Sequence, residues 1–363
     1  MVEPLSYPKF AIIELSSTAV RMIYFKEHLS SISETFSFDQ FITDEIQTNV
    51  YSCLSLDNVM NTNLFYENVI TAVKKLKKRA EKHHGVSIFY PIATTIYNSV
   101  FDKLELTTML QKQGCEHLRI LNDEEAAIAT YKSFLLSNGN GIIAYRKYRK
   151  HVNPIGTKNT SGEYYKEWNS FDLLLDIGGH HISSIISKDY RIKDLYTVNY
   201  GVVKIKKDFY FNLVTYDIVE SFLESDKRIS NNPPTDPRLI GQGFTKNCFV
   251  MGHPVRYLHN STSDRCDVFD NRNNSNNRKN HYQEFNRKQL QGYLKLIESK
   301  LVSLFSDKND LINAVNSSLT IDNALTVRLA LPLVIEIMDW FKIETITINR
   351  ADLYYSILWE KLK

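Results

Sequence analysis

An apolar run close to the start of the sequence leads into residues that could contact phosphate. Residues 10–13 are apolar, Glu14 follows them, and the hydroxyls of Ser16 and Ser17 come next. Such a run predicts a strand that delivers a carboxylate and then hydroxyl groups into a turn. Hydroxyl groups can donate hydrogen bonds, so this strand end has chemistry compatible with a phosphate ligand.

A second apolar run ends in a similar way, with glycines in place of hydroxyls. Asp176 follows residues 173–175, and Gly178 and Gly179 come directly afterwards. Glycine lets the backbone approach a ligand closely, and consecutive N–H groups can form an anion-binding nest. A single turn of this kind is more often a simple tight turn than a phosphate site.

A third strand end is expected at residues 248–251, where Gly252, His253 and Pro254 follow. A helix is expected to begin there, and a helix N-terminus favours anions through its dipole and its free N–H groups. Three such turns in one chain favour phosphate binding over three unrelated turns.

Apolar periodicity predicts alternating strands and helices around these turns. Strands are expected at residues 10–15, 20–26, 34–42, 86–92, 118–121, 171–177, 182–187, 194–199, 247–251 and 344–348. Helices are expected at residues 64–83, 98–113, 123–136, 202–211, 216–223, 289–305, 319–341 and 351–362. Strand–turn–strand openings near residues 10 and 171 predict two similar substructures that face one another.

Two polar segments interrupt this pattern and predict the domain organisation. We expect an N-terminal domain at residues 1–135 and a second domain at residues 136–363, with polar insertions at about 137–168 and 258–282. The first insertion contains a basic run at 145–151, which either guides a polyanion by charge attraction or is a solvated loop. The second is rich in asparagine and is expected to be a loop.

Composition excludes several classes of protein. The chain has 363 residues, a net charge of +3 and 43% hydrophobic residues, so it is neither wholly disordered nor a dedicated nucleic-acid binder. Its four cysteines are far apart, which argues against a disulfide scaffold or a zinc finger. We find no apolar stretch of about 20 residues and no signal pattern, so a cytoplasmic location without a membrane partner is expected.

Several segments match the motifs of one known family. Residues 14–22 correspond to the family's Asp-x-Gly-Ser-Asn-Ser-x-Arg-Leu strand end, and residues 121–126 to its Ser-Gly-x-Glu-Glu-Ala segment. Residues 176–181 correspond to its Asp-Ile-Gly-Gly-Gly-Ser turn, residues 200–203 to its Leu-Gly-Ala-Val segment, and residues 252–254 to its Gly-Gly-Thr strand end. A segment that includes residues 343–353 corresponds to its closing helix–strand–helix. On these residues the chain resembles the exopolyphosphatase / guanosine pentaphosphate phosphohydrolase (Ppx/GppA) family of the actin–sugar kinase–Hsp70 superfamily.

The resemblance implies an α/β protein with two RNase H-like (actin-like ATPase) domains flanking a central cleft. It implies release of terminal phosphate from polyphosphate or guanosine pentaphosphate by metal-assisted attack of water. The implied site consists of Glu125 as general base with Glu124 as the alternative, Glu14 and Asp176 as carboxylates for Mg²⁺, and Ser16, Ser17, Gly178, Gly179, His180 and Gly252 along the phosphate path. The implied partner is polyphosphate or a phosphorylated guanine nucleotide, a homodimer is allowed, and nucleic acid is not expected.

The chain departs from the family pattern at the site itself. Glu14 stands for Asp, Ser16 for Gly, His180 and His181 for Gly and Ser, Asn98 for a phosphate-clamping Arg, and His253-Pro254 for Gly-Thr. The alternative hypothesis is therefore a catalytically impaired relative that binds nucleotide or polyphosphate, or that interacts with proteins. A weaker third hypothesis is a sugar-kinase-like relative that uses ATP.

Individual residues also have simpler interpretations. The simpler interpretation of Glu125 is a first-turn carboxylate that interacts favourably with the helix dipole. Glu14 could be a structural acceptor at the end of its strand. His180 and His181 are either ordinary turn residues or a source of positive charge for phosphate.

Overall fold

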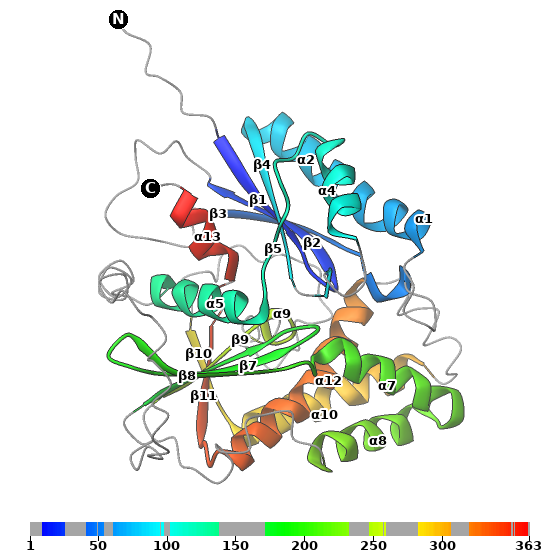
Figure 1. Ribbon diagram of the computed structural model, residues 1–363. Coiled ribbons are helices and arrows are strands. Elements are labelled where there is room, and N and C mark those ends of the chain that lie inside the picture. The colour runs from blue at the N-terminus through cyan, green and yellow to red at the C-terminus, as the bar shows by residue number, and fades with distance from the viewer. Residues whose placement is uncertain are drawn as a thin grey trace, which may run out of the picture. The chain divides into compact units, whose positions relative to one another are not determined.

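The computed structural model divides the chain into two compact units (Figure 1). Unit 1 comprises residues 1–147 and 352–363, and unit 2 comprises residues 148–351. The structure describes residues 9–25, 41–48, 50–53, 61–94, 96–97, 102–137, 171–231, 247–256, 258, 282–305, 319–349, 351 and 353–361.

Unit 1 is built on a sheet with the strand order β3-β2-β1-β4-β5. The strands are β1 (Lys9–Leu15), β2 (Ala19–Phe25), β3 (Phe41–Gln47), β4 (Val86–Ala93) and β5 (Arg119–Ile120). β1, β2 and β3 form an antiparallel meander, whereas β4 runs parallel to β1 and β5 parallel to β4. Alternate residues of β1 point to opposite faces of this sheet, and both faces are covered.

One face of this sheet packs on the helices that follow β3. They are the 3-10 turn η3 (Val50–Cys53), α1 (Thr62–Phe65), the π-helical turn η4 (Tyr66–Ile70), α2 (Thr71–His84) and α4 (Lys103–Gln111). Ala11, Ile13 and Leu15 of β1 share a core with these helices. α2 ends at Gly85, whose φ of 66° is the left-handed conformation expected of a glycine helix cap.

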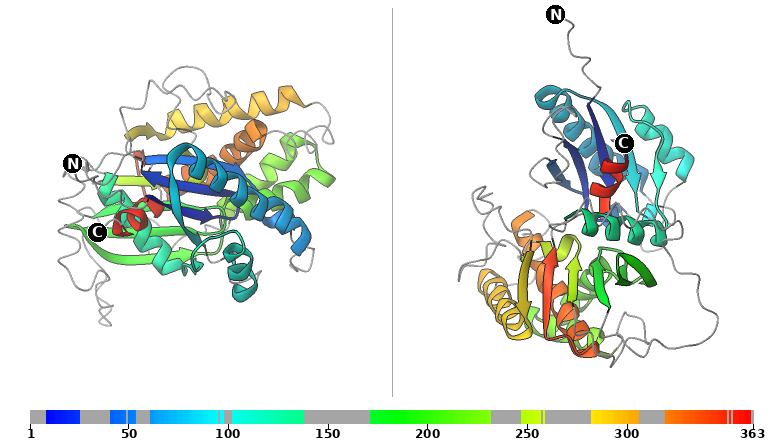
Figure 2. Two further views of the ribbon diagram at one scale, coloured as in Figure 1. Left: turned by 90° about the horizontal axis from the view of Figure 1, so that it is seen from above. Right: turned by 90° about the vertical axis from the view of Figure 1, so that its left-hand side faces the viewer.

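The other face packs on α5 (Asp123–Ser137) and α13 (Leu353–Lys361). Ile12 of β1, Ile23 of β2 and Ile92 of β4 share a core with Tyr354 and Leu358 of α13. Figures 1 and 2 show α13 lying beside α5, although more than 200 residues separate them in the sequence. The Ser133 hydroxyl donates to the Leu353 carbonyl at 3.0 Å and joins the two helices.

Unit 2 repeats the same plan with an extra strand at one edge. Its sheet has the order β10-β11-β9-β6-β7-β8. The strands are β6 (Asp172–Ile177), β7 (Ile182–Lys188), β8 (Arg191–Val198), β9 (Asn247–Met251), β10 (Tyr282–Asn286) and β11 (Thr345–Asn349). β6, β7 and β8 form the antiparallel meander, β9 runs parallel to β6, and β11 runs parallel to β9.

The helices of unit 2 form one continuous core with its sheet. They are α7 (Val202–Thr215), α8 (Ile218–Asn231), α9 (His253–Arg256), α10 (Arg287–Leu304) and α12 (Leu319–Trp340). Arg328 of α12 is only 1% exposed, and its guanidinium donates to Asp226 of α8 and Glu298 of α10. Arg328 is buried and the two carboxylates are half-buried, and together they join three helices.

The predicted two-domain α/β fold is confirmed, including the repetition of the strand–turn–strand opening. The structure differs in three details. α13 belongs to unit 1 rather than to the second domain, because its apolar side packs on α5 and β1. Asn122 rather than Asp123 caps α5, and Tyr282 begins a strand instead of ending a loop. None of the described helices has the length and apolar content needed to span a bilayer.

Candidate functional site

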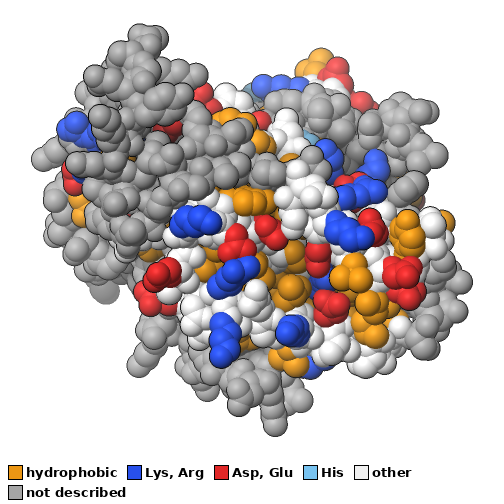
Figure 3. Space-filling model, turned by 90° about the horizontal axis from the view of Figure 1, so that it is seen from below, with side chains coloured by type: hydrophobic (Ala, Val, Ile, Leu, Met, Phe, Trp, Pro, Cys, Tyr) orange, Lys and Arg blue, Asp and Glu red, His pale blue; other side chains and the backbone are white. Residues whose placement is uncertain are grey.

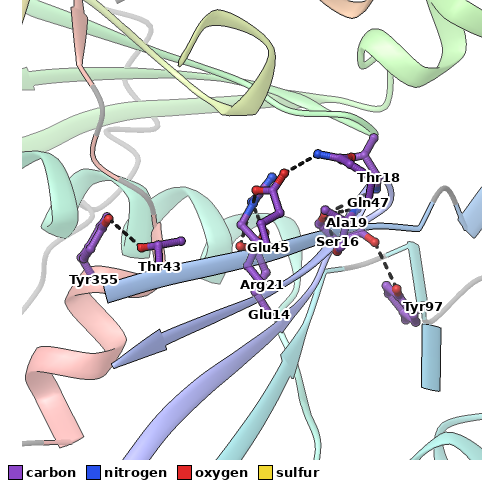
Figure 4. A network of polar contacts seen from close by, with 10 residues as sticks. All are labelled: Glu14, Ser16, Thr18, Ala19, Arg21, Thr43, Glu45, Gln47, Tyr97 and Tyr355. Atoms are coloured by element: carbon purple, nitrogen blue, oxygen red, sulfur yellow. Dashed lines mark hydrogen bonds and ion pairs between the residues drawn. The ribbon is translucent and has the colours of Figure 1, made fainter. Parts of the chain in front are cut away.

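The turn between β1 and β2 uses the hydroxyl of Ser16 for its own closure. The Ser16 Oγ donates to the Ala19 carbonyl at 2.9 Å and accepts the Ala19 N–H at 3.0 Å. The backbone N–H of Ser16 donates to the same carbonyl at 3.0 Å. Figure 4 shows Ser16 folded back onto Ala19 in this way. Ser16 therefore shapes the turn, and its hydroxyl is already engaged.

Neighbouring segments hold the same turn from both sides. The Val50 N–H donates to the Ser17 carbonyl, and the Thr48 N–H donates to the Thr18 carbonyl, both at 2.9 Å. The Tyr97 hydroxyl donates to the Ser16 carbonyl at 3.1 Å. Tyr97 is fully buried, and this burial raises the pKa of its phenol, so it remains a neutral donor. Tyr97 could not be assigned a role from the sequence, because an isolated tyrosine carries no motif.

Charged side chains form a row across the first three strands of unit 1. Glu14 of β1 is opposite Arg21 of β2, and Arg21 is opposite Glu45 of β3. Nη1 of Arg21 donates to both carboxylate oxygens of Glu14 at 2.8 Å, and Nε of Arg21 donates to Glu45. Figure 4 shows the guanidinium between the two carboxylates. Glu14 and Arg21 are 3% and 2% exposed, so this ion pair is buried.

This row determines what Glu14 can bind. Because a guanidinium already contacts both of its oxygens, Glu14 is not an open metal ligand in this structure. A fixed cation stands beside it, where the family resemblance implies a divalent metal. The residues of unit 1 therefore do not fit a Mg²⁺ ion on Glu14.

The equivalent row in unit 2 carries hydroxyls instead of charges. Asp176 of β6 is opposite Ser183 of β7, and Ser183 is opposite Thr197 of β8. Oγ of Ser183 and Oγ1 of Thr197 are hydrogen-bonded at 3.0 Å. Asp176 itself is 7% exposed. The two units thus place a buried carboxylate at the same point of their first strands, but they surround it with different chemistry.

The glycine turn after Asp176 is attached to the N-terminal end of α7. The N–H groups of Val202 and Val203 donate to the carbonyls of Gly178 and Gly179, at 3.1 and 2.8 Å. In a trans peptide the C=O and the following N–H point in opposite directions. The N–H groups of Gly179 and His180 therefore point away from α7. Because these peptides accept hydrogen bonds at the positive end of a helix, their N–H groups are polarised and suited to an anion.

Two glycines allow the backbone to pack this closely. A Cβ on Gly201 would lie 2.5 Å from the His180 nitrogen. A Cβ on Gly252 would lie 2.7 Å from the Ile177 carbonyl carbon, and Gly252 also has a φ of 115°. Gly252 therefore lies against Ile177, the residue directly before the turn. Position 252 requires glycine because a side chain there would collide with the backbone of β6.

Glu125 closes the N-terminal end of α5. Its carboxylate accepts the Asn122 N–H at 3.0 Å and a hydrogen bond from Arg119 at 3.0 Å, while its own N–H donates to Oδ1 of Asn122 at 2.8 Å. This reciprocal pair is a capping box. The hydrogen bond from the Asn122 backbone, together with Arg119, lowers the pKa of Glu125. Glu124, the alternative general base, is exposed on the first turn of the same helix.

The remaining predicted residues are only partly described. His180 is half-buried, whereas His181 is 5% exposed and its Nδ1 has no hydrogen-bond partner. Asn98, the side chain of His253 and the basic run at 145–151 lie outside the described residues, as does most of the segment 258–282. Among the described residues, no three His, Cys, Asp or Glu side chains form a group that could hold a metal ion.

The predicted site residues are divided between the two units. Glu14, Ser16, Ser17, Glu124 and Glu125 belong to unit 1. Asp176, Gly178, Gly179, His180 and Gly252 belong to unit 2, where the structure brings them together around the ends of β6 and β9.

Solved structures with the same fold span nearly the whole chain. An exopolyphosphatase from Cytophaga hutchinsonii superposes with a TM-score of 0.58 and 12% identity, covering 98% of this chain and 97% of that one. A Ppx/GppA family member from Aquifex aeolicus gives 0.57 and 12%, again covering 98% and 97%. The chain has the Ppx/GppA fold. An exopolyphosphatase-like protein gives a TM-score of 0.60 at 9% identity, covering 97% of this chain and 98% of that one.

The similarity to these proteins is found by comparing structures and not by searching with the sequence. No family model matches the chain, and no curated protein matches it in sequence. The Ppx/GppA fold is therefore retained at an identity where most side chains have changed.

Proposed function

We propose that the chain is a phosphohydrolase of the Ppx/GppA type, which releases terminal phosphate from polyphosphate or a phosphorylated guanine nucleotide. The observation that carries the proposal is the turn after β6. Two polarised N–H groups, those of Gly179 and His180, point away from α7 and follow the buried Asp176 closely in the sequence. Phosphoryl transfer depends mainly on positioning and charge neutralisation, and such donors supply both.

In this proposal the glycine turn binds phosphate oxygens. These donors belong to the turn and not to α7, whose first N–H groups donate to the carbonyls of the turn. Consecutive backbone N–H groups in a turn can bind an anion without a charged side chain. Gly179 has no Cβ that could obstruct the ligand. Gly178 is needed for packing instead, because a Cβ there would lie 2.9 Å from the His181 carbonyl oxygen. His180 follows the turn and would add positive charge to the same phosphate when protonated.

Asp176 is the carboxylate to which we assign the metal. Mg²⁺ is commonly held by one or two carboxylates together with substrate phosphates, so a preformed group of three protein ligands is not required. When bound, Mg²⁺ would neutralise charge on the phosphate. Arg21 holds Glu14, so we assign Glu14 no metal. This replaces the pair of metal carboxylates expected from the sequence with one.

The family resemblance assigns the water-directing role to the first turn of α5, in unit 1. A loose transition state for phosphoryl transfer needs an oriented water more than a strong base. A carboxylate whose pKa is lowered, as that of Glu125 is, can still accept a hydrogen bond from water. Glu124 is the exposed alternative two residues from the capping Asn122.

Phosphate release from polyphosphate and from guanosine pentaphosphate, measured with Mg²⁺, tests this proposal. Asp176→Asn should abolish turnover, whereas Asp172→Asn, at the other end of the same strand, should retain it. Gly179→Ala should raise the substrate concentration needed for half-maximal rate. A wild type no faster than Asp176→Asn would sink the hydrolase proposal.

A second function, binding without turnover, is favoured by one specific observation. Both carboxylates of unit 1 on which catalysis would depend already have basic partners, Glu14 with Arg21 and Glu125 with Arg119. A relative that has lost catalysis can keep the turn after β6. Calorimetry separates the two functions, because polyphosphate binding that Gly179→Ala weakens, with no phosphate release, supports the second.

A further inference from the structure

A line of exposed lysines runs along the outward face of α2. The inward face of this helix buries Leu76 and Ala80 in the core of unit 1, and Figure 1 shows α2 on the side of the sheet opposite α13. The outward face carries four exposed lysines, which we call the lysine stripe: Lys74, Lys75, Lys78 and Lys82. Three of them follow one another at intervals of four residues, so they lie on one side of the helix, about 6 Å apart along its axis.

Neighbouring charges do not neutralise the lysine stripe. Lys77 pairs with Glu81, and Arg79 pairs with Asp44 of β3, so these flanking charges balance one another. The three lysines of the stripe that follow Lys74 form no ion pair with any residue that the structure describes. Like charges four residues apart destabilise a helix. The stripe therefore costs stability in the free protein, and a bound anion would remove this cost.

Much of the positive charge of the chain is concentrated in this segment. Residues 62–84 contain six Lys or Arg and two Glu, an excess of four, whereas the whole chain has a net charge of only +3. The described surface in Figure 3 shows a more usual arrangement, in which Lys and Arg side chains alternate with Asp and Glu. The low net charge of the chain argued against a dedicated nucleic-acid binder, but attraction to a polyanion depends on the local field.

An exposed tyrosine lies at the beginning of the lysine stripe. Tyr66 is 40% exposed, and Nζ of Lys74 donates to its hydroxyl at 2.7 Å and lies 4.8 Å from the centre of its ring. Tyr66 begins the π-helical turn η4, and both the N–H and the hydroxyl of Thr71 donate to its carbonyl from five residues further on. Single π-helical turns within helices are frequent at functional sites. The structure thus places an accessible aromatic ring directly beside a row of cations.

We infer that the lysine stripe and Tyr66 bind single-stranded nucleic acid. The lysines contact successive phosphates, and an unpaired base stacks on the ring of Tyr66. The spacing of the lysines suits the phosphates of an extended strand, whereas the phosphates of polyphosphate share bridging oxygens and lie closer together. A duplex would meet the same lysines but offers no unpaired base to Tyr66. The inference is independent of the proposed hydrolysis, because α2 and η4 carry none of the candidate site residues.

Fluorescence anisotropy of the full chain with a labelled single-stranded RNA of about 12 nucleotides tests the role of the lysines. Contact with four phosphates predicts that the logarithm of the binding constant falls against the logarithm of the salt concentration with a slope of about −3. Lys78→Gln combined with Lys82→Gln should weaken binding about ten-fold or more and bring the slope to about −1.5. The matched control is Lys288→Gln combined with Lys295→Gln, which removes the same charge from two exposed positions of α10 and should bind as the wild type does.

Tyr66 tests the stacking. Tyr66→Ala should weaken binding of the single strand about five-fold or more and leave the salt slope unchanged, because no cation is removed. Tyr66→Phe should retain most of the affinity, because the ring remains. A duplex of the same sequence should not respond to Tyr66→Ala, and equal losses for the two would overturn the inference. So would a wild type that does not bind the RNA at about 50 mM salt, or polyglutamate of equal charge that competes as strongly as unlabelled RNA.

Discussion

Arg21 neutralises Glu14 from within the sheet of unit 1. One guanidinium nitrogen lies 2.8 Å from both oxygens of the carboxylate, and both side chains are almost fully buried. Removing one partner of a buried ion pair leaves an uncompensated charge, which costs far more than losing an exposed pair. This relationship makes the first strand end of the chain a place where stability is concentrated.

We therefore expect Arg21→Ala to lower the free energy of unfolding by about 3 to 5 kcal/mol. Urea unfolding at neutral pH measures this loss. Arg79→Ala is the control, because Arg79 forms an exposed pair with Asp44 and should cost less than about 1 kcal/mol. Combining Arg21→Met with Glu14→Met should cost less than Arg21→Met alone. Equal losses for Arg21 and Arg79 would contradict the buried pair.

Glu125 offers a test that separates capping from catalysis. Glu125→Ala removes the capping box and should lower the free energy of unfolding by about 0.5 to 1 kcal/mol, whereas Glu125→Gln, which can still accept the Asn122 N–H, should cost less. If Glu125 directs water, both variants should lose phosphate release. Loss of stability in Glu125→Ala with turnover unchanged would assign it to the helix alone.

The same carboxylate should make stability depend on pH in the acidic range. Its pKa is lowered in the folded chain, so its contribution is present above the ordinary glutamate pKa of about 4.3 and is lost as the pH falls through the folded value. The difference in stability between wild type and Glu125→Gln should therefore shrink on acidification below about pH 4.3. Thermal unfolding between neutral and acidic pH measures it. A difference that stays constant would contradict the lowered pKa.

The sequence predicted most elements of the fold because their apolar periodicity is strong. β1, β6 and α10 were expected close to their observed positions. β10 was missed because it is a short, mostly polar strand that pairs with β11 at the edge of the sheet formed by the described residues. The place of α13 in unit 1 was also missed, because its partners α5 and β1 are remote in sequence.

The site was predicted only as far as local chemistry allowed. The turn at Gly178 and Gly179 was visible as a motif, but its hydrogen bonds to α7 depend on tertiary packing. The row from Glu14 to Glu45 could not be foreseen, because it depends on the register of β3. The sequence analysis placed that strand at 34–42, whereas the described strand begins at Phe41. A register error of this kind hides every cross-strand contact.

The glycines of unit 2 should respond in opposite directions to alanine. Gly201→Ala and Gly252→Ala each force a methyl group into the backbone and should cost about 2 kcal/mol or more. Gly292 lies inside α10, and a Cβ added there would have no neighbouring atom within 4 Å. Gly292→Ala should therefore raise the free energy of unfolding by about 0.5 to 1 kcal/mol. Urea unfolding of the three variants measures the signs. A stabilising Gly201→Ala would rule out the close contact with His180.

The buried Arg328 should be the strongest single determinant of stability among the helices of unit 2. Its guanidinium donates to the two oxygens of Asp226 at 2.7 and 3.0 Å and to Glu298 at 2.9 Å, and it lies 4.0 Å from the centre of the Phe222 ring. Arg328→Met keeps the apolar stem but leaves both carboxylates without their cation. Because the two carboxylates left behind are half-buried, we expect a loss of about 2 to 3 kcal/mol at pH 7, measured by urea unfolding.

This loss should become smaller in acid. Burial raises the pKa of Asp226 even with Arg328 present, and removing the cation should raise it further. An acid whose pKa is raised by folding destabilises the fold above that pKa, and the penalty disappears as the pH falls and the group takes up a proton. The deficit of Arg328→Met should therefore be smaller at about pH 5 than at pH 7. Arg287→Met, which removes an exposed pair with Asp339, should cost less than about 1 kcal/mol at either pH. A deficit for Arg328→Met that is the same at both pH values would show that Asp226 does not carry the buried charge.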